Sequence, residues 1–240
     1  MTTTLNFGAL VGSHRWLVSV KTATGAWSFT KPGGTDIARL LLCGAGAGGS
    51  GGNLTGTAYG GGGGGGGAIA WRELEMTGNL AGSIGTGGSG SAAATTPAVG
   101  GDGGDTTCAS GLILSLTAPG GNGGLAPYGA HGNGGKGGWG AEMYGRGGQT
   151  GAPYGATGIG SSYGVCGAGG AMGHSSAGTY KGGSCVGFSG DYTAHGGHSM
   201  GAGGTNGNNG TTPGGGGGGG IQNQAGGDGG SGYAEIWYPL

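Results

Sequence analysis

Glycine dominates this chain and occurs in long runs, so an ordinary core of side chains cannot account for its fold. Of the 240 residues, 78 are glycine, and 60–67 and 214–220 contain nothing else. Glycine has no side chain to bury, and fixing its backbone costs roughly 1–2 kcal/mol per residue. The chain is therefore either a flexible linker or a structure in which bare backbones pack side by side and hydrogen-bond to one another.

Apolar segments argue against a linker, because their aliphatic and aromatic content is typical of strands. A hairpin is predicted from 15–20 and 26–29 around Thr24-Gly25. Further strands are predicted at 37–43, 68–76, 111–117 and 233–238, with a weaker one at 80–85.

The predicted fold is mostly β or irregular, with little or no α-helix. Short strands at both ends bracket a layered bundle of polyglycine type II helices with surface loops. Such helices have three residues per turn and no internal hydrogen bonds, so each N–H and C=O points at a neighbour. Four regions are expected: an N-terminal attachment or hairpin segment (1–36), glycine-rich strands (37–118), polyglycine helices with aromatic-rich loops (119–231) and a closing strand (232–240).

Charge and hydropathy exclude several classes of partner. Eight basic and nine acidic residues give a net charge of −1, with no basic stripe to neutralise phosphates, so no nucleic-acid partner is expected. No apolar run reaches the roughly 20 residues that span a bilayer, so no membrane insertion is expected. The first ten residues lack the pattern of a secretion signal.

One motif imitates a cofactor site. Gly44-Ala45-Gly46-Ala47-Gly48-Gly49 follows a predicted strand and fits the dinucleotide pattern G-x-G-x-x-G. That motif needs a helix directly after the glycines to present its N-terminus to pyrophosphate, and no helical periodicity follows here. No cofactor is therefore expected.

The chain is also poor in catalytic patterns, which predicts a protein that is not an enzyme. It contains no nucleophile elbow, paired-carboxylate motif or helical H-E-x-x-H. His195 and His198 could hold a metal with a third ligand, but a histidine pair in a glycine loop is usually polar surface. Two disulfides are possible, but we prefer small buried thiols for the four cysteines, which are Cys43, Cys108, Cys166 and Cys185.

Aromatic side chains gather between 125 and 200, where six of the nine tyrosines and four of the five histidines lie. Such side chains do not fit between closely packed glycine backbones. Rigid aromatics flanked by Gly, Ser and Asn are typical of recognition loops, although they could instead cover the bundle as a satellite core. The candidate receptor-binding residues are Tyr128, His131, Trp139, Tyr144, Tyr154, Tyr163, Tyr180, Phe188, Tyr192, His195 and His198.

The strand at 37–43 that runs into glycine, the block 60–71, the segment 100–106 and the closing 226–236 together resemble glycine-rich domains of bacteriophage tail fibres. The design is similar to that of the tip adhesins of T-even-like phages, in which polyglycine type II helices are stacked and variable segments contact the host receptor. The resemblance spans about 15–240. It implies a virion protein of the phage tail, assembled in the host cytoplasm.

The same resemblance implies the partners: a receptor on the bacterial surface, either an outer-membrane protein or a glycan, and a tail-fibre or tail-spike protein that carries the adhesin. A homotrimer is possible. The alternatives are a structural virion component, such as a decoration or fibre cap, and an ice-binding protein. Ice binding predicts a flat face of regularly spaced small residues, whereas the inserts here are bulky and irregular.

Overall fold

A computed structural model describes 16–52, 54, 61–96, 98–128, 131–132, 207–220 and 223–239. These residues form antiparallel strands and irregular extended segments and contain no helix, so the described part of the chain is mostly β, as predicted. The strands are β1 (Trp16–Lys21), β2 (Gly25–Phe29), β3 (Ile37–Cys43), β4 (Ile69–Ile84), β5 (Thr106–Leu112), β6 (Leu116–Ala118), β7 (Pro127–Tyr128), β8 (His131–Gly132) and β9 (Tyr233–Pro239).

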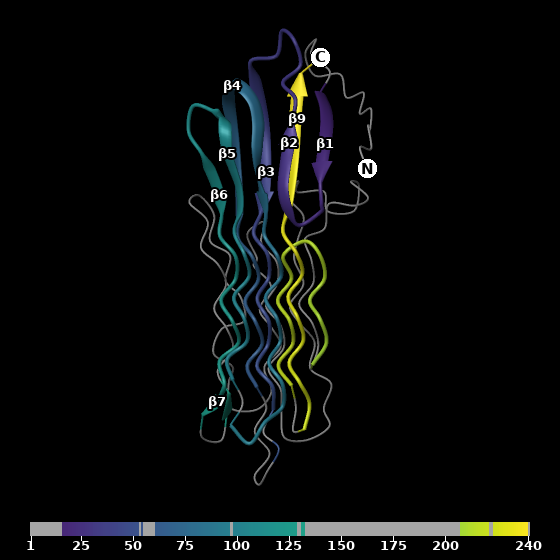
Figure 1. Ribbon diagram of the computed structural model, residues 1–240, viewed down its shortest axis with the longest axis vertical. Helices are drawn as coiled ribbons and strands as arrows, with labels where there is room; N and C mark the ends of the chain where they lie inside the picture. Colours follow the sequence, from purple (N-terminus) through teal and green to yellow (C-terminus); the bar gives the residue numbers. More distant parts are fainter. Residues whose placement is uncertain are drawn as a thin grey trace.

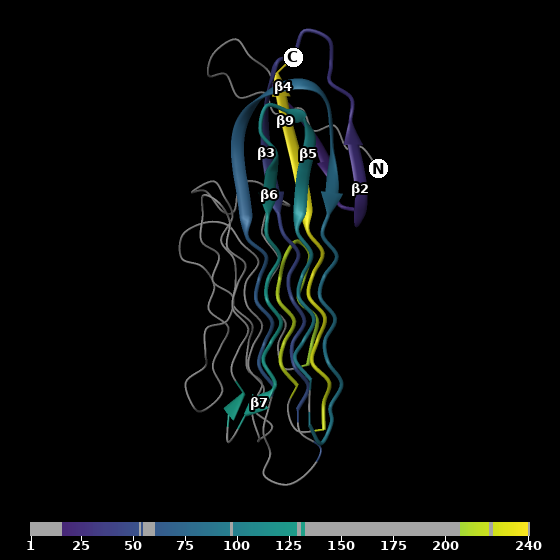
Figure 2. The ribbon, with the colours of Figure 1, turned by 60° about the vertical axis from the view of Figure 1, so that its left-hand side comes forward.

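Seven strands form one sheet that folds over on itself. Its order is β1-β9-β3-β4-β5-β6, and β2 also pairs with β4. The first part of β4 pairs with β3, and its last part pairs with β2 and β5. Figure 2 shows β4 arching over the upper end of the molecule from one half of the sheet to the other. The two halves therefore face each other as a β-sandwich.

Alternation along the strands fills the sandwich, because successive side chains of a strand point to opposite faces. In β3, Leu40 and Leu42 are fully buried in the core between the two halves, together with Ile236 of β9 and Leu80 of β4. The intervening Leu41 packs on the outer face of β3 in a smaller cluster. The apolar run at 37–43 thus supplies two packed faces.

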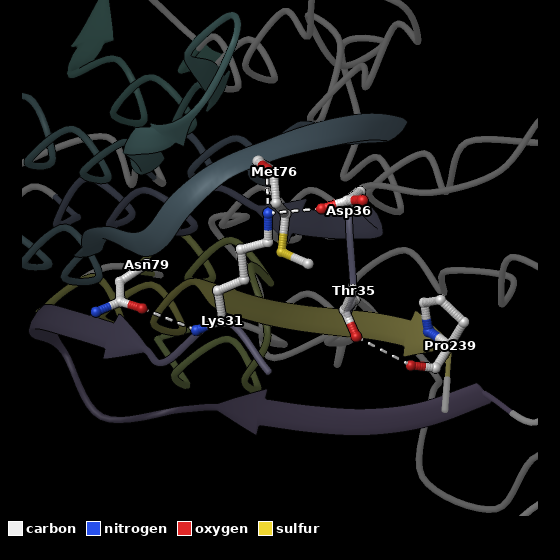
Figure 3. A network of polar contacts seen from close by, with 6 residues as sticks. All are labelled: Lys31, Thr35, Asp36, Met76, Asn79 and Pro239. Carbon is white, nitrogen blue, oxygen red and sulfur yellow. Dashed lines mark hydrogen bonds and ion pairs between the residues drawn. The ribbon is translucent and has the colours of Figure 1, made fainter. Parts of the chain in front are cut away.

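A polar network holds the bend of β4 (Figure 3). The Lys31 Nζ donates to the Met76 carbonyl oxygen at 2.8 Å and to the Asp36 carboxylate at 2.9 Å. The Lys31 backbone N–H donates to the Asn79 side-chain oxygen at 2.9 Å. Since Met76 and Asn79 flank the point where β4 leaves one half for the other, the network ties the β2–β3 connection to the bend.

Two of the strand predictions are wrong. The segments at 15–20 and 26–29 do form β1 and β2, but β1 pairs with β9 and β2 with β4, so they do not make a hairpin. The apolar run at 111–117 contains the turn between β5 and β6, in which Ile113 is 61% exposed. Periodicity could not separate a buried strand from an exposed turn in so short a run. The strands predicted at 68–76 and 80–85 are parts of one strand, β4.

Below the sandwich, glycine-rich segments run side by side as a bundle (Figure 1). The segment 44–52, which follows β3, lies at its centre. Successive N–H groups of this central segment donate to different neighbours: Gly44 to Ala68, Ala45 to Gly104, and Gly46 to Gly230. The next three residues repeat the sequence of neighbours, with N–O distances of 2.8–2.9 Å. The bonding of the central segment therefore has a period of three residues.

Among the described residues, six segments surround the central one: 61–68, 85–94, 98–105, 119–125, 214–220 and 224–232. Three of them accept its N–H groups, and the other three donate to its carbonyl oxygens, as Gly88 does to Gly46 and Gly217 does to Ala47. Each of the six is also hydrogen-bonded to the next, which closes a ring around the centre. The bundle is thus held by its backbone and not by a side-chain core.

Candidate functional site

Segments 44–52, 85–94 and 214–220 end, and 61–68, 98–105 and 224–232 begin, at the end of the bundle away from the sandwich, which we call the free end; the turn at 212–214 lies at the sandwich end. Hydrogen bonds bring the chain together there: Gly52 donates to Gln224, Gly61 to Gly220, and Gly207 to Gly219. The described residues that flank the longest undescribed stretch, 131–132 and Gly207, both lie at the free end (Figure 1). A binding site built from connections would therefore lie at this end.

Three large apolar side chains are exposed at the free end: Leu54 by 46%, Val99 by 52% and Leu125 by 44%. They come from neighbouring segments, because the Leu54 N–H donates to Ala94 and the Gly100 N–H, next to Val99, donates to Gly124, next to Leu125. Exposed apolar side chains that gather on one surface are typical of interaction sites. These three residues were not among the receptor-binding residues predicted from the sequence.

Of the eleven predicted receptor-binding residues, the structure describes the backbone of two. Tyr128 of β7 and His131 of β8 are register partners in a short antiparallel pair that follows 119–125. Figure 1 places β7 at the lower end of the bundle, at the free end. The other nine lie outside the described residues; they are Trp139, Tyr144, Tyr154, Tyr163, Tyr180, Phe188, Tyr192, His195 and His198.

The segment that fits the dinucleotide pattern has no amide left for a phosphate. Its six N–H groups, from Gly44 to Gly49, all donate to backbone carbonyl oxygens of the surrounding segments, at 2.8–3.0 Å. Phosphate-binding glycine loops work because such N–H groups point at the ligand. Here the same glycines serve the packing of backbones.

Aspartate side chains bond the outer segments of the bundle to one another. The carboxylate of Asp102 accepts the N–H of Gly123 at 2.7 Å, and that of Asp105 accepts the N–H of Gly120 at 2.9 Å. Both acceptors and both donors are three residues apart, which matches the period of the central segment. Asp228 does the same for Gly90 at 2.7 Å. The sequence signal for this pairing was the spacing of the aspartates in 100–105.

The titratable side chains of Cys43, Cys108 and Tyr233 are buried. Cys43 and Cys108 are buried thiols, as predicted, whereas Cys166 and Cys185 lie outside the described residues. Burial raises the pKa of Cys108 to about 11, so its thiol stays protonated and unreactive near neutral pH. Burial, with the carboxylate of Glu235, also raises the pKa of Tyr233, whose hydroxyl donates to that carboxylate at 2.8 Å.

The described part of the chain lacks a metal-binding cluster and a membrane-spanning helix. Its His, Cys, Asp and Glu side chains nowhere form a group of three that could hold a metal ion. None of its segments is a helix of the length and apolarity needed to cross a membrane.

A second exposed surface lies on the outer face of β1, β3 and β4, on the sandwich. The Arg39 guanidinium stacks 4.2 Å above the Trp16 ring, and its Nε pairs with Glu73 at 2.7 Å. Ile37 beside them is 44% exposed. This sandwich face combines aromatic, apolar and charged groups. It differs in this from the apolar group of Leu54, Val99 and Leu125 at the free end.

Comparisons with known proteins give one result. No curated protein matches the chain. A family model described as a glycine-rich domain matches residues 21–239, which include the sandwich from β2 onward and the whole described bundle. The chain therefore belongs to the glycine-rich domain family.

Proposed function

We propose that the segments of the bundle are polyglycine type II helices. The support is the period of three in the bonding of 44–52, which matches three residues per turn, and the absence of backbone–backbone hydrogen bonds within that segment. Such a helix can bond to six neighbours. With three residues per turn, its N–H groups point outward in three directions and its C=O groups in three others.

We further propose that the protein is a non-enzymatic adhesin at the tip of a bacteriophage tail fibre or tail spike. It binds an outer-membrane protein or a glycan on the bacterial surface. The observation that carries this proposal is the gathering of the connections at one end of a backbone-bonded rod. The described residues on either side of 133–206, the part of the sequence that holds most of the aromatic candidates, lie at that end with the exposed Leu54, Val99 and Leu125.

Rigidity is the energetic reason for such a design. A loop that is ordered only on binding loses conformational entropy at that moment, at about 0.5–1.5 kcal/mol for each immobilised side chain. Loops whose ends are fixed by a hydrogen-bonded bundle have lost part of that freedom already. The bundle then raises affinity without contacting the receptor.

The sandwich is the part we propose for attachment to a tail-fibre or tail-spike protein on the virion, as a single copy or as a homotrimer. It lies at the opposite end from the proposed receptor contacts, and its face with Trp16 and Arg39 offers aromatic, apolar and charged groups together. The alternative function is a structural virion component, for which the rod would serve as a spacer or cap.

Adsorption of the purified protein to a panel of intact bacterial strains tests the proposal. Alanine at Trp139, Tyr154 and Tyr163 should abolish adsorption and leave the thermal unfolding temperature nearly unchanged. Ile113→Ala, which removes an exposed apolar side chain at the sandwich end, is the matched control and should leave adsorption intact. Equal loss of folding and adsorption in the aromatic variants would favour a satellite core, and no adsorption by the unmodified protein would favour the structural alternative.

A further inference from the structure

We propose that the bundle protects its Asn-Gly steps from deamidation, and that the carboxylate of Asp102 protects Asn122 in particular. The described residues contain two such steps, Asn122-Gly123 and Asn209-Gly210. Both asparagine side chains are exposed, so neither is protected by burial. The inference does not depend on the proposed function.

The reaction needs the backbone nitrogen of the glycine. That nitrogen loses its proton to the solvent and attacks Cγ of the preceding asparagine, a new C–N bond closes a succinimide ring, and the carboxamide nitrogen takes up a proton and leaves as ammonia. Water then opens the ring to give aspartate or isoaspartate. Glycine favours the attack because it has no side chain to obstruct the approach. Water is the only co-reactant.

At Asn122 the attacking group is held on both sides. The N–H of Gly123 donates to the Asp102 carboxylate at 2.7 Å, so the nitrogen is held toward the neighbouring segment. The carbonyl oxygen of Asn122 accepts the N–H of Gly65 at 2.9 Å, which fixes the peptide plane that would have to rotate. Attack therefore requires this part of the bundle to open first.

Asn209 is held by a different set of bonds. The N–H of Gly210 donates to the backbone carbonyl oxygen of Asp228 at 2.8 Å. The side-chain oxygen of Asn209 accepts the N–H of Asp228 at 2.8 Å, so its carboxamide is also engaged. Because Asp102 takes no part in these bonds, Asn209 is an internal control for any change at Asp102.

Protection matters more in this architecture than in a fold with a side-chain core. Isoaspartate inserts an additional carbon into the main chain. In a bundle whose bonding repeats every third residue, that insertion would displace all later donors and acceptors of the segment. A bundle that accumulated isoaspartate would lose its register step by step.

The test compares deamidation at the two steps by peptide mass mapping after incubation at mildly alkaline pH. The purified full chain is used, with its unfolded form in denaturant as the reference. In the folded protein both asparagines should react more slowly than in denaturant. Asp102→Ala should accelerate the reaction at Asn122 on the order of tenfold, from the loss of one hydrogen bond to a charged group, and leave Asn209 unchanged.

Two further variants distinguish protection of Asn122 by the Asp102 carboxylate from a general loss of stability of the bundle. Asp102→Glu keeps a carboxylate acceptor without creating a new Asn-Gly step and should keep Asn122 slow. Asp105→Ala removes the equivalent bond to Gly120 on the same pair of segments and should change Asn122 much less than Asp102→Ala does. The proposal is overturned if Asp102→Ala leaves Asn122 unchanged, slows it, or accelerates both asparagines equally; the last result would also identify a variant that has lost its fold.

Discussion

Gly46→Ala should be among the most damaging single-methyl additions in the chain. Gly46 lies in the central segment, and a Cβ on it would lie 2.8 Å from the carbonyl oxygen of Gly214 and closer still to that of Gly215. Ordinary contacts begin at 3.4 Å, and these neighbours are backbone atoms that cannot rotate away. Segment 214–220 would have to move outward by about 1 Å, judged from normal carbon contact distances.

Such a shift breaks bonds that have no replacement inside the bundle. Gly217 donates to Ala47, next to the substituted residue, and Gly64 donates to Gly217. Each buried backbone group left without a partner costs about 1–3 kcal/mol, so two or three lost bonds amount to roughly 3–6 kcal/mol. That is a large part of the 5–15 kcal/mol that stabilises a typical domain.

Urea unfolding, followed by the fluorescence of the buried Trp27, measures the loss as a lower midpoint. Gly78→Ala is the matched control, because nothing lies within 4 Å of a Cβ there and no positive φ requires glycine. It should be neutral or stabilise by about 0.4–1 kcal/mol through the unfolded state. If Gly46→Ala were as mild as the control, backbone packing would not hold this bundle.

Three other predictions concern side chains. Asp228→Ala should lower the unfolding free energy by about 1.5–3 kcal/mol, because it leaves the N–H of Gly90 without its acceptor. Asp228→Asn keeps an acceptor oxygen and should lower it by less. Equal effects of the two variants in urea titrations would contradict this interpretation. The folded state keeps Cys108 protonated up to about pH 11, whereas the unfolded thiol ionises at 9.0, so stability should be full below pH 9 and fall by about 1 kcal/mol between pH 9 and 10. Cys108→Ala should flatten that part of the curve, and an unchanged slope would assign it to another group. Lys31→Met should lower the free energy of unfolding by about 1–2 kcal/mol, because it removes the bonds to Met76 and Asp36. Glu73→Gln, in an exposed ion pair, should lower it by less than about 0.5 kcal/mol. A larger loss of thermal stability in Glu73→Gln than in Lys31→Met would refute the role of Lys31 at the bend of β4.

The strands were largely predictable, because β-branched, aliphatic and aromatic runs carry a local signal. β3 was predicted with its observed bounds, and β9 to within one residue. Pairing was not predictable, since it depends on contacts far apart in sequence: β1 and β2 are separated by three residues, yet they lie in different halves of the sandwich. The bend of β4 was also missed, because Gly78 between two apolar runs looks like a break between strands.

For the candidate site, composition located the aromatic segment but could not show where it attaches. The described residues that flank the aromatic segment lie at the same end because 119–125 and 207–211 both reach the free end of the bundle. That arrangement is a consequence of the topology. Leu54, Val99 and Leu125 were missed because isolated apolar residues in glycine-rich sequence carry no periodic signal by themselves. Val99, however, is followed at three-residue intervals by Asp102 and Asp105, and all three are exposed. That spacing could have identified the outward positions of this segment.

Amide hydrogen exchange of the folded protein tests the central claim most directly. If six neighbours hold 44–52 by its backbone, the amides from Gly44 to Ser50 should exchange as slowly as those of the buried strand β3, even though most of these residues are glycine. Exchange of these amides at the rate of an unstructured glycine chain, while β3 stays protected, would contradict the account and leave a sandwich with flexible tails.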